Sequence, residues 1–361
     1  MKDIKKDPFE EYIKNLPPSR KEAGQAWSAA IGLQDVDGLK PSPYLYETAQ
    51  RNIDGEISME EAGALIHSYY ENKVNRLDAG TEEADKVSHR IAKILSEKAF
   101  VFSPAQYISI HNELFSGIYP FAGKLRDYNI TKKEWVLDGD TVSYGSATDL
   151  KDTLEYDFAQ EKGFRYKGLT MLESVHHIAV FISGIWQIHA FGEGNTRTTA
   201  VFLIKYLRML GFDVNNDLFA ENSWYFRNAL VRANYTNLQK GIYETTEYLE
   251  RYLGNLLLGE HNELHNREMH ISGVFATTET AVDPINDPIN DPINDGDLSM
   301  REKQVLALIK ITPNLTRTEM AAALRCSDST IKRALQSLSS KGRIQRVGSK
   351  KTGAWIIISE R

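Results

Sequence analysis

A proline repeat divides this chain into two parts. The segment DPINDPINDPIND, from Asp283 to Asp295, places a proline at every fourth position. Proline removes a backbone donor and disfavours helix at the residue before it, and the repeat has too few apolar side chains to form a core. We therefore expect an extended linker, which would span roughly 40 Å in a polyproline-like conformation.

The two parts differ in charge. From Asp297 to Arg361 the chain has 13 Lys and Arg against 5 Asp and Glu, a net charge of +8, whereas the rest carries −14. This asymmetry favours different partners for the two parts, although a solvated basic surface has the same composition. The single cysteine, Cys326, excludes an internal disulfide and fits a reducing, cytoplasmic location. The start of the chain is polar, and no apolar run reaches the ~18 residues of a membrane span, so we expect neither a secretory leader nor a membrane partner.

The part before the repeat has mainly helical periodicity. Breakers, Pro41-Ser42-Pro43 and Asp54-Gly55, separate the first two predicted helices, and Ser58 with Glu61 forms a capping box. The exception is KKEWVLDGDTVSY, where two β-rich runs flank Asp138-Gly139, a pattern typical of a β-hairpin. The predicted helices cover 18–34, 58–77, 82–99, 103–116, 146–160, 169–187, 195–210, 221–233 and 243–259.

The segment WQIHAFGEGNTRTTAVFLIKYLRMLG, from Trp186 to Gly211, is the most informative one. It begins at the end of an apolar helix and continues into a loop, His189 to Gly194, that contains two glycines. Asn195 is the expected N-cap of the next helix. Free backbone N–H groups at such a helix start can bind an anion.

Three side chains of this segment suit phosphate chemistry. Arg197 offers a positive fork for phosphate, Glu193 is a hard oxygen ligand for Mg²⁺, and His189 is a base that titrates near neutral pH. Each alone fits an ordinary structural role. Their occurrence within nine residues favours a site that acts on a phosphate compound.

HAFGEGNTR, residues 189–197, resembles the signature of the Fic (filamentation induced by cyclic AMP) family, His-Pro-Phe-x-Asp/Glu-Gly-Asn-Gly/Lys-Arg. The resemblance covers roughly 100–260. It implies a Fic-type helical bundle that uses ATP and Mg²⁺ to transfer AMP to a Ser, Thr or Tyr hydroxyl of a target protein. The β-hairpin at 131–145 would be the family's flap, which docks the target by main-chain pairing.

The resemblance also implies the roles of individual residues. His189 would accept the hydroxyl proton and Glu193 would hold Mg²⁺. The segment FRNALVRAN, 226–234, resembles one that contacts adenosine, although an ordinary amphipathic helix fits it equally. The nucleotide-binding residues implied in this way are Gly192, Gly194, Asn195, Thr196, Arg197, Phe226 and Asn234.

This sequence departs from the family pattern at three positions. Ala190 replaces Pro, Thr196 replaces Gly or Lys, and Ala200 stands where many members have a second Arg that orients the γ-phosphate. The motif fixes a base and an anion site but not the leaving group, so transfer of UMP, phosphocholine or phosphate stays open. A DNA-binding regulator that senses nucleotide without turnover also stays open, although a sensor needs no base such as His189.

Residues 23–72 are similar to small helical antitoxins that inhibit Fic toxins through Ser/Thr-x-x-x-Glu-Gly/Asn, whose Glu pairs with the second Arg. The aligned segment here is Leu33–Gly38, with Asp37 in place of the Glu. Asp37 is thus the candidate regulatory residue. Because residue 200 is Ala, these two positions cannot form the pair, and we expect Asp37→Ala to change the transfer rate little. A purely structural helical cap, or inhibition through Glu71, is the alternative.

Residues after the repeat have the pattern of a winged helix-turn-helix domain. Thr316 caps one helix, 329–340 is the candidate recognition helix, and RIQRV with AWIII would pair as the wing. Contact with another protein is the alternative to DNA binding. The recognition helix carries side chains suited to phosphates and base edges of DNA, namely Ser329, Lys332, Arg333 and Gln336.

These observations predict a mainly α protein in four parts. They are a helical, antitoxin-like regulatory region at 1–99, a Fic catalytic domain at 100–260, a linker with DPIN repeats at 261–296, and a winged helix-turn-helix domain at 297–361. A target protein on the flap and DNA at the C-terminal part are the expected partners, and a homodimer stays open.

Overall fold

The computed structural model describes residues 18–71, 79–214 and 217–272, and in the C-terminal part 305–306, 309, 316–323, 331–332, 335, 338–339, 344–347 and 354–357. The chain divides into two compact units, Met1–Asn290 and Asp291–Arg361. The division falls inside the proline repeat, which itself lies outside the described residues. The two units are therefore treated separately.

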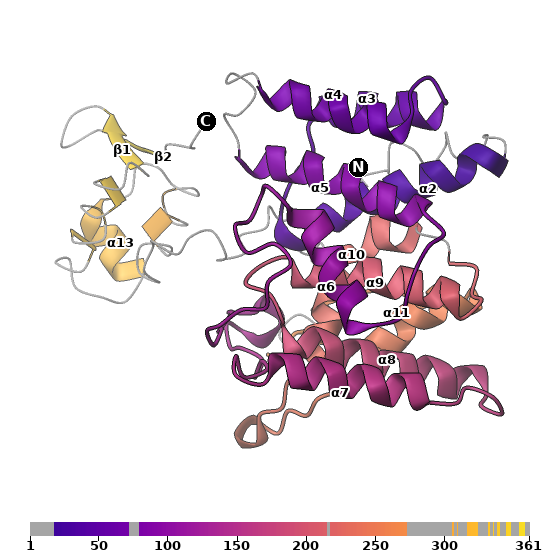
Figure 1. Ribbon diagram of the computed structural model, residues 1–361. Helices are drawn as coiled ribbons and strands as arrows, with labels where there is room; N and C mark the ends of the chain where they lie inside the picture. The colour runs from indigo at the N-terminus through magenta and orange to yellow at the C-terminus, as the bar shows by residue number, and fades with distance from the viewer. Residues whose placement is uncertain are drawn as a thin grey trace. The chain divides into compact units, whose positions relative to one another are not determined.

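The first unit is built of helices (Figure 1). Each helix predicted from apolar periodicity is present, with ends shifted by a few residues, although the last residues of the predicted helix 58–77, 72–77, lie outside the described residues. Three short 3-10 helices that matter below are η1 (Leu33–Asp37), η3 (Trp135–Leu137) and η5 (Asn266–Met269). The α-helices are α2 (Pro18–Gly32), α3 (Pro43–Ile53), α4 (Met59–Glu71), α5 (Ala79–Ser96), α6 (Pro104–Phe115), α7 (Leu150–Gly163), α8 (Met171–Ile188), α9 (Asn195–Met209), α10 (Asp217–Arg232) and α11 (Glu247–Leu258).

The structure adds one helix, α3, which the sequence pattern did not predict. Ser42 is its N-cap, and its Oγ accepts a hydrogen bond from the Leu45 N–H at 3.1 Å. Pro43 follows at the first helical position, where its missing N–H costs nothing and its fixed φ suits a helix. The Pro-Ser-Pro segment is therefore a helix start as well as a breaker.

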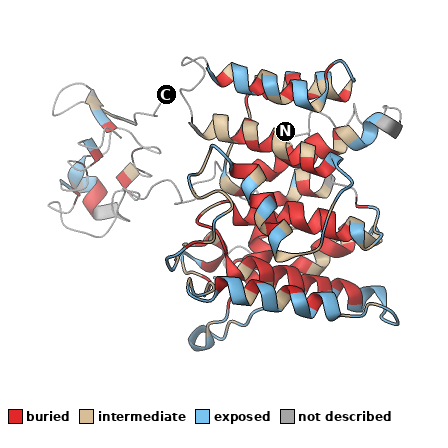
Figure 2. Ribbon diagram, viewed as in Figure 1, coloured by how far each residue is buried: buried red, intermediate tan, exposed pale blue. Residues whose placement is uncertain are grey.

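Helix α9 lies at the centre of the first unit. It packs against α5, α6, α8 and η1, and all its residues from Asn195 to Leu207 are buried. Figure 2 shows α9 almost entirely in the colour of buried residues, whereas α7 exposes its outer face. Even the ammonium of Lys205 is enclosed, where it donates to the Ile94 carbonyl at 3.1 Å and also to that of Glu97. Because α9 is covered by other helices on all sides, its first turn lies inside the protein and is held in place by packing.

The N-terminal helices share one core with the rest of the first unit. Helix α2 packs on α5 and α10, and its buried Trp27 belongs to the same apolar cluster as Phe202 of α9. A buried carboxylate, Asp85 of α5, ties α3 and α4 in place. It accepts hydrogen bonds from the Ser42 backbone and hydroxyl and from the Tyr70 hydroxyl, the last at 2.7 Å. The described residues before 100, which are 18–71 and 79–99, thus pack into the body, and no separate core divides them from it.

Residues 131–145 do not form the predicted β-hairpin. Asp138 (φ 55°) and Gly139 (φ 81°) make a tight turn, but the residues before it form η3. The Gly139 N–H donates to the Glu134 carbonyl at 3.0 Å, which closes the loop without starting a ladder. Val136 and Leu137 are both fully buried, whereas successive residues of a strand face opposite sides. The Leu137 and Asp138 N–H groups donate to the Glu134 and Trp135 carbonyls, three residues earlier, so the backbone is committed to a 3-10 turn and does not form a strand.

The second unit has its own small core. Strands β1 (Ile344–Val347) and β2 (Ala354–Ile357) pair antiparallel with Ile344 opposite Ile357, as the wing prediction requires. Thr316 and Glu319 form a capping box at the start of α13 (Arg317–Ala323). Lys332 is exposed beside buried Ile331, whereas Ser329, Arg333 and Gln336 lie outside the described residues. The core consists of Val305, Ile309, Met320, Ala321, Ile331, Leu335, Leu338 and Ile344.

Candidate active site

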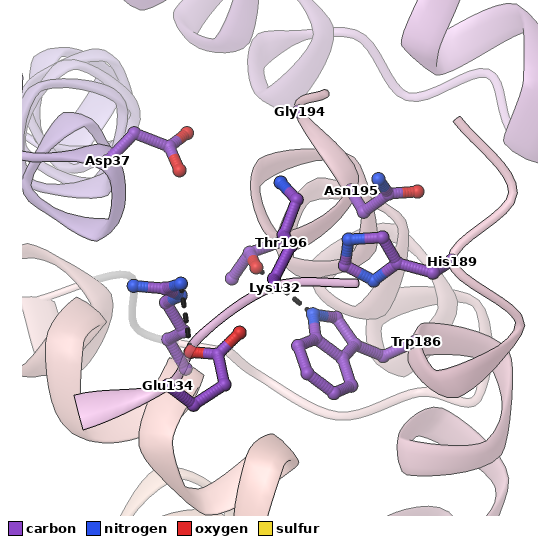
Figure 3. A pocket seen from close by; sticks show the side chains of 9 residues that line it. Asp37, Lys132, Glu134, Trp186, His189, Gly194, Asn195 and Thr196 are labelled. Atoms are coloured by element: carbon purple, nitrogen blue, oxygen red, sulfur yellow. Dashed lines mark hydrogen bonds and ion pairs between the residues drawn. The ribbon is translucent and has the colours of Figure 1, made fainter. Parts of the chain in front are cut away.

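A small polar pocket opens at the start of α9. Its empty space is about 260 Å³ including the part open to solvent, which is below the ~300–1,000 Å³ of common ligand pockets. Figure 3 shows it between Asp37 of η1 and His189 at the end of α8. Nine residues from several parts of the chain line it, namely Asp37, Lys132, Glu134, Trp186, His189, Gly194, Asn195, Thr196 and Arg227.

His189 occupies the C-cap of α8 in the left-handed conformation, with φ 49° and ψ 55°. That conformation is uncommon for a side-chain-bearing residue and costs energy unless the surroundings fix it. The ring centroid lies 4.2 Å from that of Tyr144, with the two planes tilted by 41°, and the ring stands perpendicular to Trp186. The ring is buried, and neither nitrogen has a hydrogen-bond partner in the structure. Burial, helped by the charge of Lys132, lowers the pKa of His189 well below its ordinary value, so the imidazole is neutral near pH 7.

Arg126 holds the backbone of His189 in this conformation. Its buried guanidinium donates to the carbonyls of His189 at 2.7 Å, Ile188 at 3.2 Å and Tyr128 at 2.6 Å. It also donates to the Gly145 carbonyl, and the Arg126 N–H donates to Ala190. One side chain therefore joins the end of α8 to Gly145, the last residue of the flap segment 131–145, and to Tyr128, which lies shortly before that segment. We identify Arg126 as a positioning residue.

The loop after His189 is fixed by its own polar groups. Asn195 does not cap α9, since Gly194 is the N-cap and Asn195 is the first helical residue. The Asn195 amide instead bonds both the N–H and the carbonyl of Phe191, at 3.0 and 2.8 Å. Gly194 has φ 76°, and a Cβ there would lie 2.3 Å from the Phe115 ring. Only glycine fits this position, which brings the α9 N-terminus against the pocket.

Thr196 and Gly192 complete the loop. The Thr196 hydroxyl accepts a hydrogen bond from the Trp186 indole at 3.0 Å. Thr196 and Trp186 both line the pocket. A Cβ at Gly192 would lie 2.8 Å from the Tyr128 hydroxyl, so a side chain there would displace the segment that precedes the flap. Close contacts therefore surround the chain at the point where α9 begins.

Arg197 lies at the edge of this site and is held by the N-terminal region. It is fully buried, and it donates to Gln34 at 3.0 Å and to Glu83 at 2.6 Å. Its Nε lies 2.7 Å from Oδ2 of Asp37, an ion pair without hydrogen-bond alignment. Burial alone would lower the pKa of Arg197, but Asp37, Tyr119 and Glu83 raise it above its ordinary value. Arg197 is not among the residues that line the pocket.

The Asp37 contact corrects the sequence-based argument about this residue. That argument considered only a pair with residue 200, which is a buried Ala. The carboxylate of Asp37 instead meets Arg197, one turn earlier on α9, because η1 packs directly on that helix. Asp37 therefore has a cationic partner and also lines the pocket.

Glu193, the expected metal ligand, forms an ion pair. Its Oε2 lies 2.8 Å from Nζ of Lys132, and the Glu193 side chain is 44% exposed. No group of three or more His, Cys, Asp or Glu side chains that could hold a metal occurs in the described part of the chain. Mg²⁺ at phosphate-transfer sites is commonly bound by one or two carboxylates plus substrate phosphates. Glu193 is not among the lining residues, but its partner Lys132 is, so this one exposed carboxylate beside the pocket fits a metal that arrives with a nucleotide.

Comparison with known proteins identifies the family that part of this chain matches. Residues 101–207 match the Fic/DOC family. These residues are a Fic/DOC family domain. Fic proteins generally bind ATP with a metal and transfer nucleotides or other phosphate-containing groups to proteins. No curated protein matches the chain.

Two solved structures are similar to this chain. One is the N-terminal FIC domain of Bep8, a VirB-translocated effector protein from Bartonella sp. 1-1C, with 17% identity over 49% of this chain and 86% of that chain, and a TM-score of 0.38. The other is a Fic family protein from Desulfovibrio desulfuricans G20, with 13% identity over 96% of this chain and 89% of that chain, and a TM-score of 0.43.

His189, Gly194, Asn195 and Thr196 of the motif line the pocket, whereas Gly192, Glu193, Arg197 and the suggested adenosine residues do not. Phe226 is fully buried in the core against Phe219 and Tyr252. Asn234 donates to the carbonyls of Ser183 and Leu230, at 3.0 and 2.9 Å. Neither residue lines the pocket, because both side chains contact neighbouring helices instead.

In the described residues of the chain, no helix is both long and apolar enough to cross a membrane.

His111 supports the motif loop, a contact that sequence reasoning missed. The Gly123 N–H donates to its Nδ1 at 2.9 Å, so the proton sits on Nε2, which donates to the Glu193 carbonyl at 3.0 Å. The ring also stacks on Phe191 at 3.7 Å. No local pattern identifies His111, because the loop that it supports lies 82 residues further along the chain.

We expect the free energy of unfolding to fall as the pH drops below ~6.5, partly through His111. Burial lowers the pKa of His111 to about 4, whereas the unfolded chain takes up the proton near pH 6.5. The unfolded state therefore binds more protons between these values, and stability is lost as pH falls. The contribution of His111 between pH 7 and 5 is about 2 kcal/mol. Urea titrations of wild type and His111→Gln should show a shallower pH slope for the variant.

Proposed function

We propose that this protein is a Fic-type adenylyltransferase, which transfers AMP from ATP to a Ser, Thr or Tyr hydroxyl of another protein. The observation that carries the proposal is His189. Its neutral ring faces a polar pocket with both nitrogens unpartnered, beside the start of a buried helix. A buried base kept neutral, next to an anion site, suits proton removal from a hydroxyl that attacks a phosphate.

In the proposed reaction, the target hydroxyl gives its proton to the His189 imidazole as its oxygen forms a bond to the α-phosphorus. The bond from that phosphorus to the bridging oxygen breaks, and pyrophosphate leaves. The backbone N–H groups at the start of α9 would stabilise the developing charge. Glu193 would hold Mg²⁺, which supplies further neutralisation of phosphate charge when it is bound. Arg126 keeps the His189 backbone in place throughout.

The flap segment, residues 131–145, remains our proposed dock for the target protein. Thr131 and Lys133 are exposed, and the loop ends on the Arg126 contacts beside His189. A target strand that paired with this backbone would bring its hydroxyl towards the imidazole.

Labelled ATP tests the proposal against its main rival. The full-length protein would be incubated with a cell lysate and ATP labelled on either the α- or the γ-phosphate. AMP transfer predicts that protein is labelled only from the α-position. Labelling from the γ-position would instead indicate phosphate transfer, and labelling from neither would contradict adenylylation. UTP in parallel covers the transfer of UMP.

Glu193→Ala is expected to weaken the Mg²⁺ dependence of ATP binding. Glu193 is the carboxylate of the motif loop, and a hard oxygen ligand is lost without disturbing the buried loop contacts. Calorimetry with Mg²⁺ and with a chelator measures the difference. Glu155→Ala, on α7, is a suitable control because Glu155 is exposed and far from the motif in sequence. An unchanged ratio of the two affinities in Glu193→Ala would exclude the metal role.

A second candidate function, DNA binding by residues 297–361, is favoured by their +8 charge and by the exposed Lys332. We expect the full chain to bind duplex DNA with an affinity that falls steeply with salt, because phosphate contacts release counterions. Gel shifts on random duplexes at 50 and 200 mM salt would measure this. Lys332→Ala should weaken binding, and absence of any shift at low salt would favour a protein partner.

A further inference from the structure

We propose that Lys132 is a phosphate-binding residue, which exchanges Glu193 for the phosphate chain when Mg²⁺ and nucleotide enter the pocket. This inference rests on the proposed function and deepens it. Few cations face the pocket. Arg197, the cation of the motif, does not line it, because its guanidinium is held by Gln34, Glu83 and Asp37. Among the lining residues the cations are Lys132 and Arg227.

The Arg227 guanidinium already forms a buried ion pair with Glu134. Its Nη2 lies 2.9 Å from Glu134, and both side chains are almost completely buried. Glu134 also accepts a hydrogen bond from the Tyr144 hydroxyl at 3.1 Å. Separating a buried pair leaves an uncompensated charge at high cost. Arg227 therefore belongs to the wall of the pocket.

Lys132 is in the opposite situation. Its Nζ meets Glu193 at 2.8 Å, and because the Glu193 side chain is 44% exposed, solvent weakens this pair. Its backbone is anchored by the N–H donated to Thr141, while its four-carbon side chain can swing. Figure 3 shows the Lys132 side chain between Asp37 and His189, among the residues that line the pocket. An ammonium group so placed can change partner without moving the backbone.

Charge balance supplies the reason for the exchange. Asp37 and Glu134 also line the pocket, so an incoming phosphate chain meets carboxylates as well as cations. While Glu193 is without a metal, Lys132 neutralises it. When the carboxylate takes Mg²⁺, the ammonium loses its partner, and the phosphate oxygens that enter with the metal are the nearest replacement. Lys132 thus neutralises Glu193 in the absence of Mg²⁺ and binds phosphate when Mg²⁺ and nucleotide are bound.

Binding calorimetry on the full chain tests the exchange, with Lys132→Met compared against Lys133→Met. Lys133 is the adjacent, exposed lysine, so the control removes the same charge outside the pocket. In the presence of Mg²⁺ we expect Lys132→Met to bind ATP about tenfold more weakly, equivalent to ~1.4 kcal/mol. Adenosine, which has no phosphate, should bind equally to both variants. Lys132→Arg, which keeps the charge, should restore most of the ATP affinity.

The outcomes separate this inference from the proposed function. An ATP affinity in Lys132→Met equal to or tighter than that of wild type would overturn the phosphate role, and the tighter case would leave Lys132 as a guard of Glu193 only. An equal loss for ATP and adenosine would indicate a change of pocket shape and also overturn it. With a chelator present, the deficit for ATP should shrink, since Lys132 then stays with Glu193. Wild type that binds no ATP would overturn the proposed function and this inference together.

Discussion

His189→Ala is expected to lower the rate of AMP transfer by ~10²–10⁴-fold, the range for a positioned general base. ATP should still bind, because the proposed role of His189 is to receive a proton, whereas the proposed phosphate contacts are the start of α9 and Lys132. The substitution also removes a ring packed against Tyr144 and Trp186, so part of any loss could come from the fold. Initial rates with α-labelled ATP, together with calorimetry for binding, separate the two effects.

His189→Asn is the sharper variant. Asn tolerates the left-handed backbone at this position better than Ala does, but it cannot act as a base. Both variants should lose transfer to a similar extent. His176→Ala is a matched control, since His176 lies on the same helix with an exposed side chain paired to Glu250. Retention of near-normal labelling by His189→Asn would remove the imidazole from the mechanism.

Asp37→Ala is expected to raise the transfer rate by about tenfold, which is ~1.4 kcal/mol in the barrier. The sequence alone suggested little change. The structure reverses this expectation, because the carboxylate lines the small pocket and pairs with buried Arg197. Its removal takes a negative charge away from the phosphate site and loosens one of the contacts that hold the guanidinium outside the pocket. Gln34 and Glu83 still satisfy Arg197, so the fold should survive.

Asp35→Ala tests whether the effect is specific. Asp35 lies on the same 3-10 helix but does not line the pocket. Initial rates on one target, with wild type and both variants, give the comparison. We propose Asp37 as a regulatory residue only if its variant alone is faster. A slower Asp37→Ala enzyme would mean that the carboxylate supports Arg197 in a productive position, and an unchanged rate would return Asp37 to a structural role.

The proposed AMP transfer and the proposed DNA binding use separate parts of the chain. His189 and Lys132 belong to the first unit, whereas Lys332 belongs to the second. Loss of transfer in the His189 variants with unchanged DNA binding would show two independent activities. A protein that binds DNA and ATP but labels nothing would match the nucleotide-sensing regulator.

Local patterns predicted most of the helices because helix formation depends on side chains three and four residues apart and on the capping residues beside them. The capping box of Ser58 and Glu61 was predicted and is present, with hydrogen bonds of 2.7 and 3.1 Å. The same reasoning failed at residues 131–145, since turn chemistry at Asp138-Gly139 is local but burial of Val136 and Leu137 depends on the surrounding core. It also missed α3, because Pro-Ser-Pro both ends a preceding segment and begins this helix, with Ser42 as N-cap and Pro43 as its first residue.

By itself, the sequence determined the two-part division, the helical class and the motif 189–197, because composition, periodicity and spacing are properties of neighbouring residues. Only the tertiary structure decided which side chains meet the motif from a distance. Arg126 fixes His189, His111 supports the loop, and Asp37 contacts Arg197. These contacts arise because the packed core brings separate segments to within a hydrogen bond, and chain separation leaves no trace of such pairs in a single sequence.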